Sequence, residues 1–437
     1  MLEQLFKLKE HKTNVRIELL AGLTTFMTMA YIIFVNPLIL SDAGMDRGAV
    51  TTATILAAAL STILMGLWAK HPFALASGMG LNAFFAYYVA AKADSWEAAL
   101  GAVFLSGVAF FVLAITGAIT HIDAAVPTSL KRAVAVGIGL FIALIGMKNA
   151  GIVKAFEPTL VQLGDLSAPE PKLAIIGLLI TCILMVFKVV KVRGAMLIGI
   201  LLTTVIGIPM GVTYTGGGIV GAPASLSPIL FKMDIGGALS LGFMVIFSFL
   251  FVDIFDTMGT LMGTATRTGM LDAKGRLPRV KEAMAADAVG TMFGAVVGTS
   301  TVTTYVESSA GIAEGGRTGL TAVVVGILFL LSLFFTPLAT MVPGAATAPA
   351  LIIVGVLMMG AVTGINFEDF TEALPAFMTI VVMPFTFSIS HGIAAGFVFY
   401  PIVKLAAGRG KEVHPLVYAL AVVSLAHLFP ELLAFLG

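Results

Sequence analysis

The chain has 437 residues, of which 59% are hydrophobic and 11% charged, and its mean hydropathy is +1.04. Soluble globular proteins carry about 25% charged residues, so this composition excludes a soluble enzyme and predicts a polytopic membrane protein. The formal net charge of +1 is uninformative as a total, whereas the distribution of the charges indicates orientation. The single cysteine, Cys182, cannot form an intramolecular disulfide.

The charged first 18 residues and the long apolar run after them do not have the pattern of a cleavable signal peptide, so the first segment is expected to remain in the membrane. A spanning helix needs about 20 mostly apolar residues, and the windows taken here as predicted spans lie near 19–40, 49–69, 76–91, 97–119, 130–148, 172–189 and 194–212. After the glycine-rich stretch 213–228, further windows lie near 237–264, 280–298, 300–315, 318–341, 346–363, 372–390 and 391–408. The sequence therefore predicts an all-α polytopic membrane protein with about 14 transmembrane segments.

A last apolar window, 413–434, is interrupted by His414, His427 and Glu431. We expect it to lie in the membrane interface as an amphipathic helix rather than to span. If the N-terminus starts in the cytoplasm, most of the 25 Lys and Arg residues fall in cytoplasmic connections. This bias predicts a multi-pass protein with a cytoplasmic N-terminus, and the resemblance given below implies the bacterial plasma membrane (the cytoplasmic or inner membrane).

Seven spans per half is an odd number, so homologous halves would be inserted in opposite orientations. Weak internal similarity supports two inverted seven-span repeats. The string LIGMKNAGI (144–152) resembles LMMGAVTGI (357–365), and GAMLIGILL (194–202) resembles GIAAGFVFY (392–400). The matched strings share glycine placement and occur in the same order in both halves.

Spans three and ten do not have the composition of continuous lipid-facing helices. Span three, HPFALASGMGLNAFFAYYVAA (71–91), begins with Pro72 and contains a glycine pair before its apolar end. Span ten, GTSTVTTYVESSAGIAEGG (298–316), is rich in β-branched residues and then carries Glu307, serines and glycines. Irregular backbone at membrane depth occurs where it lines a cavity, and paired broken segments indicate the binding site of a transporter. We expect each to form a short extended piece followed by a half-helix.

Few polar side chains lie inside the spans, and a charge at the centre of a spanning helix costs about 2.5–3.5 kcal/mol, which makes each a functional candidate. Asp253 and Asp256, spaced i and i+3, share one face of span eight. Glu307 lies near the start of the half-helix of span ten, and Asn82 occupies the comparable place in span three. Each also has a structural interpretation: hydroxyl packing for the span-eight acids, a helix cap for Glu307, and backbone hydrogen bonding for Asn82. Asp287 in span nine is expected to be structural.

A cavity with carboxyl groups and a carboxamide, and with no Arg or Lys in spans three, eight or ten, disfavours an anionic ligand. Acids would suit a small cation, but a neutral heteroaromatic molecule with several N–H donors fits better, because a carboxylate accepts paired N–H bonds and Asn both donates and accepts. A buried carboxyl group can also carry a proton. The aromatic side chains considered for stacking on a flat ligand are Phe26, Phe84, Phe85 and Tyr305. No residue spacing fits a metal site, and no cofactor or nucleic-acid partner is expected.

The chain resembles the adenine/guanine/hypoxanthine permeases, the purine branch of the nucleobase–cation symporters, which are related to uracil and xanthine permeases. The resemblance covers essentially the whole chain. It rests on AGLTTFMTMAYIIFVNP (21–37), SGMGLNAFFAY (77–87), FVDIFDTMGTL (251–261), GTSTVTTYVESSAGIAEGGRTG (298–319) and APALIIVGVLMMG (348–360).

The resemblance implies a core domain formed by residues 1–127 (spans one to four) and 236–344 (spans eight to eleven). It implies a gate domain formed by residues 128–235 (spans five to seven) and 345–437 (spans twelve to fourteen and the C-terminal helix). It also implies import of purine nucleobases, guanine and hypoxanthine first and adenine next, by proton symport. Pairing of gate domains in the family suggests a homodimer.

The family's substrate positions carry over onto this sequence, and the expected substrate-binding residues are Asn82, Asp253, Glu307, Gly80 and Thr303. The expected proton-coupling residues are Asp256, Asp253 and Glu307. One alternative function is an anion exchanger or channel on the same inverted-repeat fold, which the missing cationic side chains disfavour. A membrane enzyme is disfavoured because no nucleophile–base or metal spacing is present.

Overall fold

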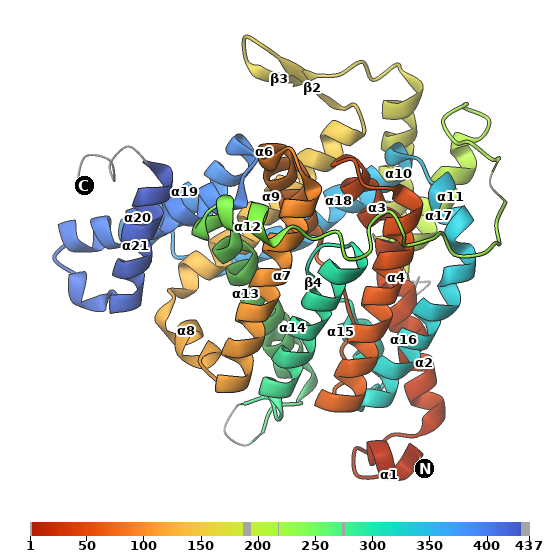
Figure 1. Cartoon of the computed structure of the whole chain (residues 1–437), viewed down its shortest axis with the longest axis horizontal. Coiled ribbons are helices and arrows are strands. Elements are labelled where there is room, and N and C mark those ends of the chain that lie inside the picture. Colours follow the sequence, from red (N-terminus) through yellow and green to blue (C-terminus); the bar gives the residue numbers. More distant parts are fainter. Residues whose placement is uncertain (1, 187–193, 217, 273–275, 430–437) are drawn as a thin grey trace.

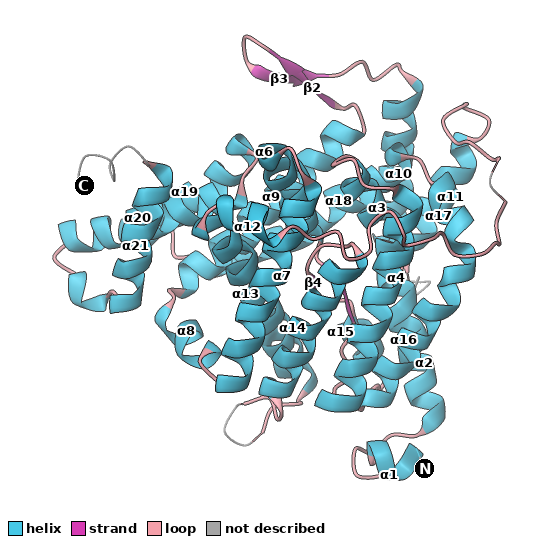
Figure 2. Cartoon of the chain, in the orientation of Figure 1, coloured by secondary structure: helices cyan, strands magenta, loops and turns pink. Residues whose placement is uncertain are grey.

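The computed structural model describes residues 2–186, 194–216, 218–272 and 276–429, and the chain is mostly helical (Figures 1 and 2). Within these residues, nine helical segments are long and apolar enough to cross a membrane. They are Val15–Ser41, Arg47–Ala69, Trp96–Thr116, Thr128–Asn149, Pro169–Val186, Phe243–Thr266, Gly319–Met341, Gly344–Gly364 and Ile389–Ala406. The all-α polytopic fold is therefore confirmed, while the count of fourteen spans and the inverted repeats stay predictions.

The long helices follow the predicted windows closely. The first half contains α1 (Leu2–Phe6), α2 (Val15–Met29), α3 (Ile32–Ser41), α4 (Arg47–Leu64), α7 (Trp96–Thr116), α8 (Ile119–Ala125), α9 (Thr128–Asn149), α10 (Pro169–Val186) and α11 (Ala195–Gly207). The second half contains α12 (Ile235–Ser240), α13 (Phe243–Thr268), α14 (Val280–Val297), α16 (Gly319–Ser332), α17 (Thr336–Met341), α18 (Gly344–Met359), α19 (Phe370–Thr386), α20 (Ile389–Ala406) and α21 (Pro415–Leu428). Residues 187–189 of the sixth window lie outside the described part of the chain.

Spans three and ten are broken as the sequence predicts. Span three begins with strand β1 (Leu75–Ser77) and continues as α5 (Met79–Phe84), a π-helical stretch (Phe85–Ala90) and α6 (Ala91–Ala93). Span ten begins with strand β4 (Val302–Thr304) and continues as α15 (Ser308–Ala313). Proline and glycine disfavour a continuous helix in the first case, and β-branched residues favour a strand in the second.

Two windows predicted as continuous helices are interrupted in the structure. Window 19–40 breaks between α2 and α3, where the backbone changes to i→i+3 hydrogen bonds such as that from Ile33 N to Ala30 O (3.1 Å). Window 237–264 breaks at Gly242, whose φ of +87° suits glycine and ends α12 before α13 begins. The first break places Tyr31 beside a cavity described below.

The expectation for the C-terminal window also needs correction, and one hairpin was not predicted. Helix α21 carries apolar residues on all sides and packs against α20, so the predicted amphipathic helix is wrong. Glu431, one of the residues expected to interrupt it, lies outside the described residues. A hairpin that the sequence analysis missed, β2 (Val153–Phe156) and β3 (Leu160–Leu163), connects α9 to α10 at the face opposite α1 (Figure 1).

The helices pack in two sets. In one set α9 packs against α18 and α19, α19 against α20, and α10 against α11 and α18. In the other set α7 packs against α12, α13 and α14, while α16 packs against α2 and α4. Contacts between the sets are sparse by comparison, and one of them joins α5 to α9. The two broken spans lie in the second set, along its border with the first.

Candidate functional site

The extended pieces of spans three and ten meet as a two-stranded ladder near the middle of the fold (Figure 1). Strand β1 pairs antiparallel with β4, with Leu75 opposite Thr304. The ladder continues where Gly78 N donates to Thr301 O (3.0 Å). Because the strands are antiparallel and each is followed by a helix, α5 and α15 leave the ladder from opposite ends. Backbone groups that a broken helix would leave unpaired are satisfied by this pairing.

Buried carboxyl groups of α13 and α14 hold β4 in place. Asp287 Oδ2 accepts hydrogen bonds from the hydroxyls of Thr257 (2.7 Å) and Thr304 (3.0 Å). Asp253 Oδ2 accepts from the hydroxyl of Thr291 (2.9 Å), whose oxygen also accepts from a backbone N–H of β4 (3.1 Å). These two acids therefore hold the strand through hydrogen-bonded hydroxyl groups, in agreement with the structural role expected for Asp287.

A cavity of about 110 Å³ lies between the ladder and the first set of helices. A single water molecule needs about 10–15 Å³, so the cavity has room for a small flat molecule. Helices α5, α9, α13 and α18 and strand β4 contribute to it, together with Tyr31 before α3, Gly78 after β1 and the residues between β4 and α15. The lining residues are Tyr31, Gly78, Met79, Gly80, Leu81, Ile138, Ile142, Val252, Asp256, Thr260, Thr303, Thr304, Tyr305, Val306, Glu307, Val354 and Met358.

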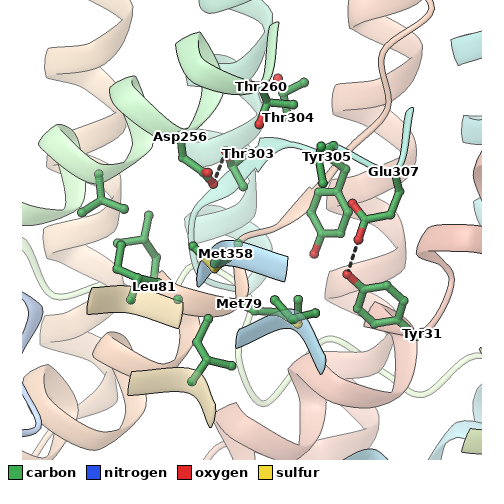
Figure 3. A pocket seen from close by; sticks show the side chains of 17 residues that line it. Tyr31, Met79, Leu81, Asp256, Thr260, Thr303, Thr304, Tyr305, Glu307 and Met358 are labelled. Atoms are coloured by element: carbon green, nitrogen blue, oxygen red, sulfur yellow. Dashed lines mark hydrogen bonds between the residues drawn. The ribbon is translucent and has the colours of Figure 1, made fainter. Parts of the chain in front are cut away.

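Glu307 immediately precedes α15 at one side of this cavity (Figure 3). Its side chain does not cap the helix; Glu307 Oε1 instead accepts a hydrogen bond from the Tyr31 hydroxyl (2.7 Å). Tyr305 lies beside it, and its hydroxyl donates to the backbone oxygen of Ser77 (2.5 Å). Both rings are thus fixed at their polar ends, and the second carboxylate oxygen of Glu307 is left for another donor.

Asp256 lies at the other side of the cavity (Figure 3). Its Oδ2 accepts a hydrogen bond from the Thr303 hydroxyl (3.2 Å), and the side chain is exposed to the cavity rather than enclosed by protein. Two carboxyl groups from different elements therefore face one small space, with a hydroxyl between them.

The structure brings four of the expected site residues together at the cavity, Gly80, Asp256, Thr303 and Glu307. Asn82 and Asp253 are fully or almost fully buried and do not line it. Asn82 Oδ1 accepts from the Ser77 hydroxyl (2.8 Å), and its buried Nδ2 has no hydrogen-bond partner among the described residues. Gly78, rather than Asn82, occupies the place comparable to Glu307, because each of these residues immediately precedes its half-helix. Asn82 lies one helical turn beyond Gly78.

Of the four aromatic candidates, only Tyr305 lines the cavity. Phe84 and Phe85 are buried in the core, and Phe26 packs edge-on against Phe329. The second ring at the cavity, Tyr31, was not among the candidates. No local sequence signal indicated Tyr31, because the helix break beside it contains no proline or glycine.

None of the described residues that line the cavity is Lys, Arg or His. Along the described ranges, no group of three or more His, Cys, Asp or Glu residues is arranged to hold a metal ion. The cavity therefore combines carboxyl and hydroxyl groups with apolar and aromatic walls. Such a surface suits an uncharged ligand rich in N–H donors and repels anions.

The sequence model of the Permease family (Xan_ur_permease) matches residues 16–395. The adenine permease AdeP of Escherichia coli K12 is 47% identical over 97% of this chain and 95% of its own length. The guanine/hypoxanthine permease PbuG of Bacillus subtilis is 46% identical over 97% of this chain and 98% of its own length. Among solved structures, the transmembrane domain of the cyanobacterial bicarbonate transporter BicA superposes with a TM-score of 0.65 at 16% identity, covering 88% of this chain and 97% of that one, which is a likeness of fold alone.

Proposed function

Because the chain belongs to the Permease family, and is therefore a multi-pass membrane transporter rather than an enzyme, we propose that it imports purine nucleobases by proton symport. Guanine and hypoxanthine are the proposed first substrates, and adenine the next. The names of two relatives that align over nearly the whole chain support this substrate class. The observation that carries the proposal is the pair of carboxyl groups, Asp256 and Glu307, that face one cavity with no cationic side chain lining it.

In the proposed complex the purine ring lies between β4 and the α9–α18 wall. Glu307 accepts an N–H edge of the base through the oxygen that Tyr31 does not engage. The open start of α5 at Gly80 offers N–H donors for ring nitrogens or a carbonyl oxygen, and the hydroxyl oxygen of Thr303, whose hydrogen is donated to Asp256, offers an acceptor. Tyr305 provides an aromatic wall. Asn82 and Asp253 lie behind the residues that line the cavity, where they accept hydrogen bonds from Ser77 and Thr291.

We assign proton coupling to Asp256 first, with Asp253 and Glu307 as further carriers. Asp256 faces the cavity and has one hydroxyl partner but no cation, so its charge is balanced most simply by a proton that travels with the substrate. We assign the second set of helices to the core (1–127 and 236–344) and the first set to the gate (128–235 and 345–437). Sparse contacts between them suit relative movement.

The test is uptake of radiolabelled hypoxanthine, guanine and adenine into proteoliposomes, with and without an inward proton gradient. We expect gradient-driven uptake of at least one purine and its loss in Glu307→Gln. Glu170→Gln, a matched change at an exposed position in the first turn of α10, should transport normally. Absence of purine uptake under every gradient would overturn the substrate, and uptake of bicarbonate or sulfate instead would favour the anion-exchanger alternative.

A further inference from the structure

Polar side chains join the two sets of helices at a place away from the cavity, at the face that carries α6 and the β2–β3 hairpin (Figure 1). We call this the outer face, and α1 lies at the opposite face (Figure 1). The contact is made by Tyr87 and Tyr88, which follow one another in the π-helical stretch Phe85–Ala90 of span three. Short π-helical stretches are rare in proteins overall, and those that occur are often found at functional sites.

Tyr87 joins the two sets through one hydroxyl group. It donates to Asp42 Oδ2 (2.6 Å), just after α3, and accepts from Asn149 Nδ2 (3.1 Å) at the end of α9. Lys148, the residue before Asn149, places its ammonium nitrogen 5.0 Å from the centre of the Tyr87 ring. Asp42 and Tyr87 belong to the proposed core, and Lys148 and Asn149 to the proposed gate.

Tyr88 makes the equivalent connection to another gate helix. Its hydroxyl lies 3.0 Å from Nε2 of His391, near the start of α20. The ring of Tyr88 stacks on Phe84 of its own helix, with centroids 5.3 Å apart and planes 12° apart. The stacking holds Tyr88 in the orientation that reaches His391.

Below this contact lies a second cavity, of about 220 Å³, whose walls come from both sets. The core contributes Val35, Leu38, Ile39, Asp42 and, at the domain boundary, Gly344, and the gate contributes Asn149, Thr347 and Leu351. The same two residues that bind the Tyr87 hydroxyl, Asp42 and Asn149, therefore border a space on the outer side of the molecule.

Helix α13 borders the ligand cavity through Asp256 and has an exposed side. Asp256, Gly259 and Gly263 lie along one exposed side of α13, and a Cβ atom added at either glycine would meet no atom within 4 Å. Helix α13 runs from α12, near the outer face, toward the face that carries α1 (Figure 1). The structure is thus joined at the outer face and open along α13.

We propose that Tyr87 and Tyr88 form an outer latch, which holds the protein closed at the outer face and is broken in each transport cycle. The inference rests on the proposed transport by movement of core against gate. The latch residues do not touch the ligand cavity, so they set the balance between closed and open states and leave the binding contacts unchanged. Loss of a latch bond shifts that balance toward the state that is open outward.

The test measures opening directly, without substrate. In a Cys182→Ala background, Thr347→Cys places a reporter thiol in the outer cavity. A membrane-impermeant maleimide is added to sealed, oriented vesicles on the side opposite the N-terminus. We expect Tyr87→Phe to raise the labelling rate about fivefold, the effect of losing one hydrogen bond. The matched control is Tyr418→Phe, which removes a hydroxyl that binds Gly410 within the gate alone (3.0 Å).

A double-mutant cycle separates the latch from a general loss of packing. Asn149→Ala should raise labelling as Tyr87→Phe does, and the double variant should label no faster than either single variant. Tyr87→Phe is also expected to alter the maximal rate of uptake, because it changes the population of the outward-open state. Equal labelling of Tyr87→Phe and Tyr418→Phe, with both proteins monodisperse, would overturn the latch. Because labelling needs no purine, failure of the proposed substrate would leave a distinct result: faster labelling without purine uptake.

Discussion

Acidic side chains are treated differently in two regions of this molecule. At the end of α20, Lys404 lies 2.6 Å from Glu372 and 3.1 Å from Glu412, and Arg409 lies 2.6 Å from Asp369. We call these five residues the Lys404 cluster. In the ligand cavity, by contrast, no cationic side chain lines the space that Asp256 and Glu307 face. In the first region every acid is paired with a cation, and Lys404 and Arg409 together serve three acids. In the second region the acids receive only hydroxyl donors.

Under the proposed function, the difference separates acids that build the fold from acids that bind the ligand. A charge removed from water must be paired or hydrogen-bonded, and a pair that is complete has little left to offer a substrate. Glu18 illustrates the structural case without a cation, because it accepts hydrogen bonds from the backbone N–H groups of Arg317 (2.9 Å) and Thr321 (3.1 Å). Glu307 has one donor, Tyr31, and so retains an acceptor oxygen for the substrate.

The largest effect on stability is expected where the pairing is complete. Lys404→Met keeps the apolar stem and removes the ammonium group of a side chain that is 1% exposed, which leaves Glu372 without its cation. Breaking a buried ion pair by removing one partner costs about 3 kcal/mol. We expect a lower midpoint of thermal unfolding in detergent, whereas the exposed Lys411→Met should change it little. A Lys404→Met protein as stable as wild type would contradict a structural role for the cluster.

Asp256→Asn tests the other region and should show the reverse pattern. The unfolding midpoint should stay near that of wild type, because no cation loses its partner. Proton-driven accumulation of purine should fall about tenfold or more, the effect of losing an interaction with a charged group. Exchange of internal for external purine should persist, since it moves no net proton. Asp165→Asn, in an exposed loop, is the matched control. Loss of exchange and accumulation together would assign Asp256 to binding rather than to coupling.

Much of this arrangement could be predicted from local sequence. Glycines, a proline and β-branched residues located the breaks in spans three and ten, because these residue types act on their own backbone. The pairing of β1 with β4 was not predicted, since it joins Leu75 to Thr304 across more than half of the chain. No local pattern specifies a partner at that separation.

The positions of individual side-chain oxygen atoms also could not be predicted from the sequence. Residues i and i+3 share a helix face but differ in direction by about 60°. That angle is enough for Asp253 to face Thr291 of α14 while Asp256 faces the cavity. Tyr31 was missed for a related reason. Its place at the cavity depends on the break between α2 and α3, and no proline or glycine lies at that break to predict it.

Tyr31→Phe sharpens the comparison by reducing the donors to Glu307 from one to none. The ring stays, but Glu307 Oε1 loses the hydroxyl that holds it at 2.7 Å. We expect purine affinity to weaken about fivefold, as for one hydrogen bond, with the unfolding midpoint nearly unchanged. Tyr214→Phe, at a side chain that is 81% exposed, should bind as wild type does. Tighter binding in Tyr31→Phe would show instead that the tyrosine competes with the substrate for the carboxylate.

The smallest effect is expected from pH acting on the Lys404 cluster. Hydrogen bonds from Arg409 lower the pKa of Asp369 to about 2, and hydrogen bonds from Arg409 and Lys404 lower the pKa of Glu412 to about 2. Unfolded Asp and Glu titrate near pH 4, so the stability from these pairs is present above about pH 4 and is lost as the pH falls toward 2. The difference in unfolding midpoint between wild type and Arg409→Gln should therefore stay constant from pH 8 to pH 5 and shrink below pH 4. Any change of transport rate between pH 5 and pH 8 must then arise elsewhere in the molecule, and the uncompensated acids of the ligand cavity are the groups placed to cause it. A midpoint difference that varied between pH 5 and pH 8 would instead make the Lys404 cluster part of the pH response.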